Sequence, residues 1–264
     1  MQQNKNYLPL ITVISVVYND EANLETTIKS VLAQTYPNIE YIIIDGGSTD
    51  NTLGIIKKYE DKIAYWVSEK DAGIYDAMNK GVQASTGAWV NFMNSQDVFF
   101  EPSTILDIFS KDHANYDVLY GNVGIKYPNG FSRIAKPRDF ADLWQGMICS
   151  HQAIFARTEL LKEYPFDLNY KLAADFDLIY KLKQRNKRFL YFDQVIAIIS
   201  SGGVSDDDRV RAVKEYYQIV CKYPVKIFWR IYYKLMIVYT YFKLRGKKNL
   251  PKGLIEIFLK FKWG

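Results

Sequence analysis

The sequence predicts an α/β fold in which helices flank a mostly parallel sheet, followed by an amphipathic helical tail. From Ile11 to Phe92, short apolar runs of strand length alternate with helical patterns, which is typical of βαβ units. The 264 residues are 48% hydrophobic and 24% charged, enough for a substantial core, so a disordered or collagen-like chain is excluded. Of the 34 Lys and Arg residues, 11 lie in residues 221–264 beside the single acid Glu256, so residues 1–220 carry a net charge of −5.

The first half of the chain supplies the parallel strands. Residues 11–17 form a β-branched run that is apolar on both faces, as a central parallel strand must be. Asn19 and Asp20 then cap a helix that runs to about Gln34. The further expected elements are a strand at 41–45, a helix from the caps at 48–50 through Tyr59, strands at 63–67 and 88–93, and a helix at 74–84.

After Pro102 the pattern becomes α+β. The expected elements are a helix at 103–110, a strand at 118–120, a hairpin turn at 128–130, a strand at 151–155, a helix at 174–184, a strand at 189–192 and a helix beginning near Asp206. No repeat or low-complexity linker divides the body. We therefore expect one domain over 1–220, with a nucleotide-binding half at about 1–100 and an acceptor half at about 101–220, and a tail at 221–264.

Cysteine usage and the N-terminus indicate a cytoplasmic protein. Cys149 and Cys221 allow neither a disulfide framework nor a Cys/His zinc cluster, which suits a reduced compartment. Met1 to Leu10 lacks the basic start and apolar stretch of a secretion signal.

Polar residues follow the predicted parallel strands, where open α/β sheets bind ligands. The first strand ends in Val17-Tyr18-Asn19-Asp20, and the second ends in Asp45 followed by two glycines that let backbone approach a ligand. Asx residues at such turns also cap helices and close turns, so a purely structural role for Asp45 stays open.

A third polar segment, residues 68–81, surrounds one predicted helix start. Its polar residues include Glu69, Lys70, Asp71, Asp76, Asn79 and Lys80. Lys80 can reach a phosphate as a point charge while acids and amides address hydroxyls. The alternative is a solvated helix face.

The fourth segment, residues 91–99, takes a buried strand directly into Asn94-Ser95-Gln96-Asp97. Asp97 can ligate a hard divalent cation, Mn²⁺ or Mg²⁺, that is shared with substrate phosphates. An ordinary turn aspartate is the alternative.

Together these segments resemble the family 2 glycosyltransferases, which have the GT-A fold, and within them the bacterial enzymes of surface-polysaccharide and O-antigen assembly. The resemblance runs from about Thr12 to Val204. It rests on VISVVYND and IDGGSTDNT for the nucleotide-binding strands, SEKDAGIYDAMNKG, NSQD at the metal-binding position, HQAIF, and LAADFDL at 172–178. Relatives often carry a second aspartate where Gly46 stands, and an acid or a glycine where Gln96 stands.

The resemblance implies an inverting, metal-assisted transfer from a nucleoside-diphosphate sugar, most often a UDP-sugar, to a saccharide hydroxyl. The implied donor-binding residues are Val17, Asn19, Asp45, Glu69, Asp71, Asp76, Asn79, Lys80 and Gln96. Asp97 holds the metal, and Asp175 is the general base that deprotonates the acceptor, with Asp177 as a substitute. Asp175 also opens a predicted helix, so a capping role is open.

Two further features bear on catalysis. His151 either orients the acceptor or is a strand histidine with its hydrogen bonds satisfied. Residues 200–205 have the small side chains of a flap that closes over a bound donor, although a plain turn explains them equally well.

The tail predicts a basic amphipathic helix at 226–248. Lys226, Arg230 and Lys234 recur at four-residue spacing beside an apolar stripe of Ile227, Ile231, Leu235, Val238 and Phe242. The uncharged run is too short to cross a bilayer, so we expect an in-plane helix on the inner face of the cytoplasmic membrane, with Trp229 at headgroup depth. The acceptor is then a lipid-linked saccharide. Packing on the body or on a second subunit is the alternative.

Two other functions also fit parts of the sequence. A sheet crevice with a metal also suits a sugar nucleotidyltransferase, although no glycine-rich basic loop follows the first strand. A catalytically weak sugar-nucleotide-binding subunit of a membrane assembly is another alternative, suggested by Gln96. Nucleic-acid binding is not expected, because the body is acidic and the stripe in the tail is of the helix-burying type.

Overall fold

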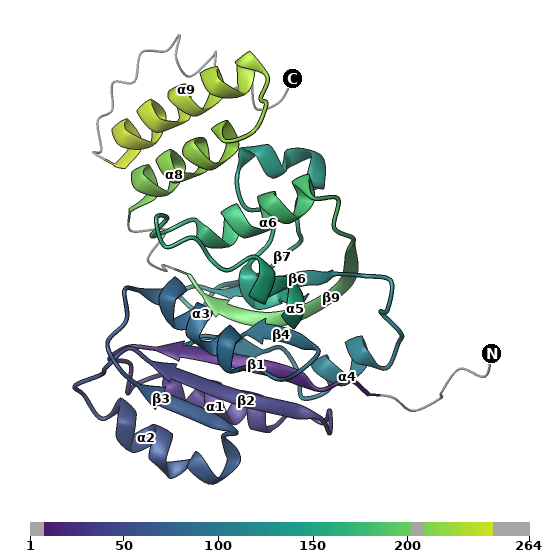
Figure 1. The fold of residues 1–264 in the computed structure, drawn as a ribbon. Helices are drawn as coiled ribbons and strands as arrows, with labels where there is room; N and C mark the ends of the chain where they lie inside the picture. Colours follow the sequence, from purple (N-terminus) through teal and green to yellow (C-terminus); the bar gives the residue numbers. More distant parts are fainter. Residues whose placement is uncertain (1–7, 202–207, 245–264) are drawn as a thin grey trace, which may run out of the picture.

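The structure, a computed structural model, describes residues 8–201 and 208–244 and contains one mixed sheet (Figure 1). The strands run in the order β3-β2-β1-β4-β8-β6-β9-β5, and β7 pairs with β6. Their bounds are β1 Ile11–Val17, β2 Ile39–Asp45, β3 Tyr65–Ser68, β4 Trp89–Phe92, β5 Val98–Phe99, β6 Val118–Lys126, β7 Ser132–Ala135, β8 Ile154–Arg157 and β9 Phe189–Ser200.

The helices lie on both faces of this sheet. The α-helices are α1 Leu24–Leu32, α2 Thr52–Lys58, α3 Ile74–Ala84, α4 Thr104–Phe109, α5 Thr158–Glu163, α6 Ala174–Gln184, α8 Arg209–Cys221 and α9 Ile227–Leu244. Short 3₁₀ segments are η1 Glu60–Lys62, η2 Phe140–Gln145 and η3 His151–Ala153. The predicted α/β class with a mostly parallel sheet is confirmed for the half of the sheet that carries the first polar segments.

Four neighbouring strands are parallel and end at the same edge. β1 pairs in parallel with β2 and with β4, and β2 pairs in parallel with β3. The order β3-β2-β1-β4 places a change of winding direction between β1 and β4, which is where open sheets bind ligands. From β4 onward the pairing becomes mixed, because β8 runs antiparallel to both β4 and β6.

Two apolar layers form the core. One cluster packs α1, α2 and α4 on one face of the sheet through side chains such as Ile28, Ile56 and Ile108. The other packs α3, α5, α6 and the later helices on the opposite face, with Met78 and Phe176 fully buried. Every residue of β1 is buried, as expected for a central strand covered on both faces.

The last two helices stack outward from α6 (Figure 1). α8 packs on α6, and α9 packs on α8. Trp229 of α9 stacks on Trp144 with ring centroids 4.9 Å apart, and the Tyr233 hydroxyl donates to the Trp144 carbonyl oxygen. One face of α9 is therefore attached to the body of the molecule.

The expected elements agree with the structure where the local pattern decides them. The expected bounds 11–17, 74–84 and 174–184 are those observed. β6 and β9 are longer than expected, because they pair with each other over much of their length. The α1 helix begins at Leu24 rather than directly after Asp20, because residues 21–23 form a turn before it and the cap residue is Asn23.

Three sequence-based expectations need correction or fall outside the described residues. The expected strand at 151–155 is wrong at its start, because 151–153 form η3 and the strand begins at Ile154. Trp229 is not an exposed headgroup anchor, since it stacks on Trp144 and its Nε1 atom is buried. Most of the expected flap at 200–205 lies outside the described residues. Among the helices that the structure describes, none is long and apolar enough to cross a bilayer.

Candidate active site

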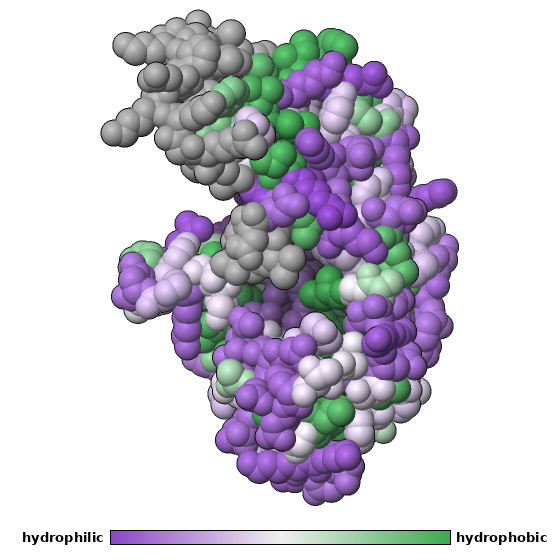
Figure 2. All heavy atoms as spheres, turned by 90° about the vertical axis from the view of Figure 1, so that its left-hand side faces the viewer, coloured by the Kyte–Doolittle hydropathy of each residue, from purple (hydrophilic) through white to green (hydrophobic). Residues whose placement is uncertain are grey.

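Four loops meet at the edge where β1 to β4 end. Figure 2 views the molecule from this side and shows a hollow between the sheet half below and the helical part above. Many of the residues around the hollow are hydrophilic, and some hydrophobic residues lie beside it. The sequence-predicted donor and metal segments come from the loops and helix starts that follow these strands, whereas the predicted base Asp175 lies at the start of α6, after β8 and α5.

The loops after β1 and β2 are joined by hydrogen bonds. The Asn19 backbone N–H donates to Ser48 Oγ (2.7 Å), and the Thr49 N–H donates to Asn19 Oδ1 (2.8 Å). The Val17 carbonyl accepts from the Gly46 N–H (2.9 Å). Asn19 and Val17 thus connect the loop after β1 to the loop after β2. Their predicted contact with a nucleoside stays a prediction.

Asp45 closes its own loop. Its side chain is fully buried, and its carboxylate accepts from the backbone N–H groups of Gly47 (3.1 Å) and Ser48 (2.9 Å). The hydroxyls of Ser48 and Ser68 also donate to it. The structural role that the sequence left open is therefore present, and a direct contact from Asp45 to a base stays a prediction.

Gly46 has a steric reason to lack a side chain. A Cβ atom at Gly46 would lie 2.6 Å from Asp71 Oδ2 and 3.4 Å from the Tyr18 ring. Asp71 is itself held by the Gly73 N–H, which donates to its Oδ1 (2.8 Å). Asp71 thus occupies the space that a side chain at Gly46 would take, and Tyr18 lies beside it with 64% of its surface exposed.

The Lys80 ammonium pairs with acids of its own segment. It lies 2.7 Å from Glu69 and 3.7 Å from Asp76, and it donates to the Lys70 carbonyl (3.2 Å). The hydrogen bond with Glu69 raises the pKa of Lys80. A phosphate that binds Lys80 would therefore have to compete with Glu69.

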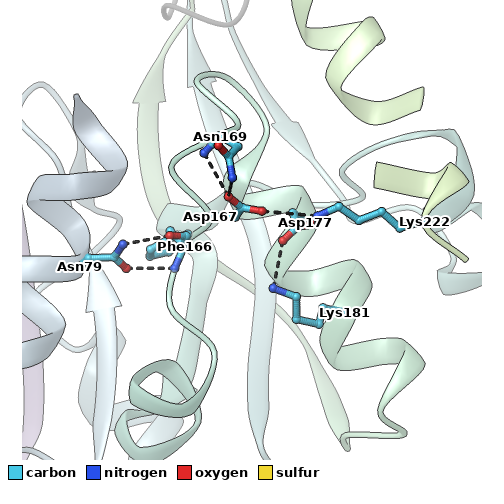
Figure 3. A network of polar contacts seen from close by, with 7 residues as sticks. All are labelled: Asn79, Phe166, Asp167, Asn169, Asp177, Lys181 and Lys222. Atoms are coloured by element: carbon cyan, nitrogen blue, oxygen red, sulfur yellow. Dashed lines mark hydrogen bonds and ion pairs between the residues drawn. The ribbon is translucent and has the colours of Figure 1, made fainter. Parts of the chain in front are cut away.

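Asn79 joins two parts of the fold. Its amide donates to the Phe166 carbonyl (2.9 Å) and accepts from the Phe166 N–H (2.9 Å), as Figure 3 shows. Both the nitrogen and the oxygen of this amide are therefore hydrogen bonded to the segment between α5 and α6. The structure assigns Asn79 this link, and its predicted donor contact stays untested.

The turn after β4 places Asp97 in a buried position. Gln96 precedes it with a left-handed backbone (φ 80°), which a side chain rarely adopts. The Asp97 carboxylate accepts from Gln152 Nε2 (2.6 Å), and the backbone of Ser200 also hydrogen bonds to it. Burial raises the pKa of Asp97 to about 6, although these hydrogen bonds act to lower it.

These residues fit a hard divalent cation that takes most of its ligands from substrate and water. Asp97 is a buried carboxylate whose hydrogen-bond donors are neutral, and the same turn holds Asn94 Oδ1, a buried oxygen without a hydrogen-bond partner. Within residues 8–201 and 208–244 there is no cluster of three His, Cys, Asp or Glu residues that forms a site by itself. A cation here would rest on Asp97 and the donor's phosphates.

Asp175 lies in the first turn of α6, where three side chains meet. Its Oδ1 accepts from the Tyr75 hydroxyl (3.0 Å), and its Oδ2 lies 3.7 Å from His151 Nδ1. His151 Nε2 is in turn 3.0 Å from Asn94 Nδ2. The cap position of α6 is Ala173, so Asp175 is not the helix cap.

Asp177 points away from this group. It is buried and pairs with Lys181 Nζ (3.1 Å) and Lys222 Nζ (3.2 Å), as Figure 3 shows. Burial acts to lower the pKa of Lys222, but Tyr170 and Asp177 outweigh it and raise the pKa. Asp177 thus attaches α6 to the end of α8, and its predicted role as a substitute base stays a prediction.

A cavity of about 30 Å³ lies between the sheet and α6 beside the Asp175–His151 pair. Apart from these two residues its lining is apolar: Val90, Phe92, Met147, Ile154, Ala156, Leu161, Phe166, Leu178, Ile179 and Leu182. A low-dielectric wall of this kind strengthens electrostatic interactions of the adjoining carboxylate.

Three residues of this group were not identified from the sequence. Gln152 and Tyr75 hydrogen bond to Asp97 and Asp175, and Tyr18 is exposed at the end of β1. The sequence does place Gln152 next to His151 and Tyr18 next to Asn19. Their position next to predicted site residues is the feature that could have identified Gln152 and Tyr18. No feature of the neighbouring sequence indicates a site role for Tyr75.

The fold brings polar loops together at the ends of parallel strands, the edge at which open α/β sheets bind nucleotides. Residues 12–165 match the model of glycosyl transferase family 2, and the chain belongs to this family. It is a glycosyltransferase that uses a nucleotide sugar, as the resemblance in the sequence implied.

Similar proteins come from several organisms. The chain is 34% identical over 175 residues to a PGL/p-HBAD biosynthesis glycosyltransferase of Mycobacterium bovis, covering 64% of this chain and 68% of that protein. It superposes on residues 1–349 of S. aureus TarS in complex with UDP with a TM-score of 0.63, at 22% identity, over 89% of this chain and 72% of that one. Another TarS chain is covered over 43% of its length.

A third similar structure is the mannosyltransferase PcManGT from Pyrobaculum calidifontis, in complex with GDP-Man and Mn²⁺. Its TM-score is 0.66 at 18% identity, over 88% of this chain and 71% of that one. At this identity the two superpositions establish the shared fold.

Proposed function

We propose that this glycosyltransferase inverts the anomeric centre as it moves a sugar from a UDP-sugar to a hydroxyl of a lipid-linked saccharide in surface-polysaccharide synthesis. One observation carries the proposal. Two consecutive residues, His151 and Gln152, contact the predicted base Asp175 and the predicted metal ligand Asp97 respectively. One short segment, residues 151 and 152, therefore contacts both the carboxylate proposed to activate the sugar donor and the one proposed to activate the acceptor. A direct transfer between two bound substrates requires these two groups to be close together.

The donor side binds the nucleotide at the ends of β1 and β2. The exposed Tyr18 ring beside Gly46 offers a face on which a base can stack. UDP is favoured as the nucleotide because structures of TarS hold UDP and UDP-GlcNAc, whereas PcManGT holds GDP-Man. The remaining donor contacts are those expected from the sequence, among them Asn19, Asp71 and Lys80.

Asp97 would hold Mn²⁺ or Mg²⁺, and such a cation supplies charge that stabilises the departing diphosphate. The support is the buried carboxylate of Asp97 with its neutral hydrogen-bond donors, together with the Mn²⁺ that accompanies GDP-Man in PcManGT. Lys80 adds positive charge once a phosphate displaces Glu69 from it.

Asp175 accepts the proton of the acceptor hydroxyl as that hydroxyl attacks the sugar from the face opposite the diphosphate. A carboxylate with 17% of its side chain exposed remains accessible to a bound hydroxyl. The Tyr75 hydroxyl fixes Oδ1, which leaves Oδ2 on the His151 side for the proton. A single displacement of this kind inverts the anomeric centre, and Asp175 serves as its general base.

The acceptor side faces a membrane through α9. The exposed residues Ile227, Ile231 and Val238 form an apolar stripe, and the charged Arg230 and Lys234 beside them are exposed as well. Figure 2 shows hydrophobic residues at the upper end of the molecule, where α9 lies. An apolar stripe flanked by cations suits anionic lipid headgroups, so the enzyme works at the inner face of the cytoplasmic membrane.

The test is a thermal-shift panel of UDP, GDP, dTDP and CMP, followed by UDP-glucose, UDP-galactose, UDP-GlcNAc and GDP-mannose, each with and without Mn²⁺. We expect a shift with UDP and one UDP-sugar that needs both Mn²⁺ and Asp97, and that Asp97→Ala abolishes. Nucleotide binding that ignores both would contradict the metal assignment. Pyrophosphate as the product would indicate a nucleotidyltransferase, and binding without turnover would indicate a binding subunit.

Tyr18 is tested in the same panel. Tyr18→Ala should weaken UDP binding by about tenfold, since stacking on an aromatic ring contributes about 1–3 kcal/mol per base. Tyr65→Ala is the matched control, because Tyr65 is also exposed (46%) but lies at the start of β3 and not in a loop that follows a strand end. Equal effects of the two substitutions would contradict a base contact from Tyr18.

A further inference from the structure

Helix α8 holds the segment that leads into α6. Glu215 of α8 is buried, and its carboxylate accepts from two consecutive backbone N–H groups, those of Lys171 (3.1 Å) and Leu172 (2.8 Å). The half-exposed Arg211 pairs with the same carboxylate (3.1 Å). A buried carboxylate is costly unless its oxygens are fully used, and two of these three donors belong to another part of the fold.

The segment that Glu215 holds ends at Asp175. Leu172 is followed by Ala173, the cap residue of α6, which has no side-chain hydrogen bond to hold the helix start. Asp175 lies in the first turn that follows. The position of this turn, and with it the direction of the Asp175 carboxylate, therefore depends on contacts made from outside α6.

A second contact from α8 acts on the same helix. Lys222 lies two turns after Glu215, on the same side of the helical path, and pairs with Asp177 of α6 (3.2 Å) and with Asp167 (3.4 Å), as Figure 3 shows. α8 thus fixes α6 at its start through Glu215 and at its first turn through Lys222.

The held segment also reaches the donor loop. Lys171, whose N–H Glu215 accepts, donates from its Nζ to the Ala72 carbonyl (3.1 Å). The Tyr75 hydroxyl then meets Asp175 from the donor side. The 171–175 segment is consequently held between α8 on one side and the donor loop on the other.

We propose that Glu215 is a positioning residue for the transfer reaction: it sets the start of α6 so that Asp175 faces the acceptor hydroxyl. This inference rests on the proposed role of Asp175 as general base. It also means that α8 contributes to the reaction through Glu215, which acts on the position of Asp175.

The experiment measures kcat and the donor KM of the full-length protein, as UDP released from the UDP-sugar that the panel selects, with water as acceptor. Glu215→Ala should lower kcat by about ten- to a hundredfold while the donor KM stays unchanged, because a displaced reacting group costs rate rather than donor affinity. Glu215→Gln keeps the size of the side chain and one accepting oxygen, so it should fold and lose less. Lys214→Ala is the matched control, since Lys214 is exposed beside Glu215 on the same helix, and this variant should leave kcat unchanged.

A double-mutant cycle separates positioning from general destabilisation. In the Asp175→Asn background, Glu215→Ala should lower kcat no further, because a residue that acts through Asp175 has nothing left to position. A further loss of the same size, a change confined to the donor KM, or an unchanged kcat in Glu215→Ala would each overturn the inference. If Asp175→Asn alone keeps full turnover, the proposed base fails and this inference fails with it. If Asp175→Asn is inactive and Glu215→Ala is normal, only the inference fails.

Discussion

The Tyr75 hydroxyl donates a 3.0 Å hydrogen bond to Asp175 Oδ1, although 100 residues separate the two in the chain. Tyr75 belongs to α3, which follows the donor loop, and Asp175 belongs to α6. Burial and the nearby Asp175 charge raise the pKa of Tyr75, so its hydroxyl keeps its proton and remains a donor. The donor and acceptor halves are thus joined at the proposed base.

Tyr75→Phe removes only this hydroxyl. We expect kcat to fall by about tenfold with an unchanged donor KM, since a hydrogen bond to a charged group contributes about 1.5–3 kcal/mol. Steady-state kinetics with the selected UDP-sugar measures it. Tyr59→Phe is the control, because the Tyr59 hydroxyl donates in the same way to Glu25 (2.6 Å), a carboxylate that the proposed mechanism does not use. A loss of equal size in both variants would contradict the account.

The left-handed backbone of Gln96 (φ 80°) is strained because this residue has a side chain. Gln96→Gly should raise the free energy of unfolding by about 1 kcal/mol, because a left-handed backbone disfavours a side chain by about that amount. Gln96→Gly should also weaken UDP-sugar binding, because Gln96 is one of the predicted donor-binding residues. Asn186→Gly is the control: it has φ 55°, lies after α6, and should leave binding unchanged. Chemical denaturation and a binding isotherm measure the two effects, and unchanged binding in Gln96→Gly would remove Gln96 from the donor site.

Asp97 gives the metal-free protein a pH-dependent stability. Its pKa in the fold is about 6, above the value near 4 of an unfolded chain, so its ionisation costs stability as pH rises from about 4 through 6. In EDTA, Asp97→Asn should therefore be more stable than the parent by about 1–3 kcal/mol at pH 8, with no difference below about pH 4. Urea unfolding across this pH range tests it. If Asp97→Asn is less stable than the parent at pH 8, burial does not raise the pKa of Asp97.

The exposed stripe of α9 should bind anionic membranes. Ile231 is 44% exposed, so Ile231→Glu should fold normally but weaken binding to phosphatidylglycerol vesicles by about tenfold, through lost apolar burial and added negative charge. Ile134→Glu on β7 carries the same change at a site that is 60% exposed, and should keep binding. Co-sedimentation measures both. A point substitution is sharper than a deletion from residue 222, which would also remove the Lys222–Asp177 pair.

The sequence predicts best those parts that local patterns decide. The strand at 11–17 and the helices at 74–84 and 174–184 are predicted with their observed bounds, because their apolar residues recur at strand or helix spacing. The sequence does not predict the full length of β9, because its second half is a strand through pairing with β6 and β5. The 3₁₀ start at His151 was missed for a similar reason, because the neighbouring contacts come from Asn91 and Asn94.

Site residues, too, are predicted where the neighbouring sequence identifies them and not where distant contacts place them. The sequence marks Asp97 by its place after a buried strand, the family resemblance adds Asp175, and two roles stay open for His151. The structure brings all three into one neighbourhood. The sequence does not mark Gln152, Tyr75 or Glu215, whose partners are distant in the chain. Asn79 shows the converse, since a polar residue near the donor segment turns out to bind the Phe166 backbone.

The most direct test of the account is the turnover of Asp175→Asn beside its donor affinity. Calorimetry with UDP and Mn²⁺ and a UDP-release assay on the same preparation measure both. We predict that kcat falls by at least about a hundredfold while the dissociation constant for UDP stays within about twofold, because a general base acts in the transition state and not on bound nucleotide. Turnover close to that of the parent, with binding intact, would contradict Asp175 as the base and with it the proposed mechanism.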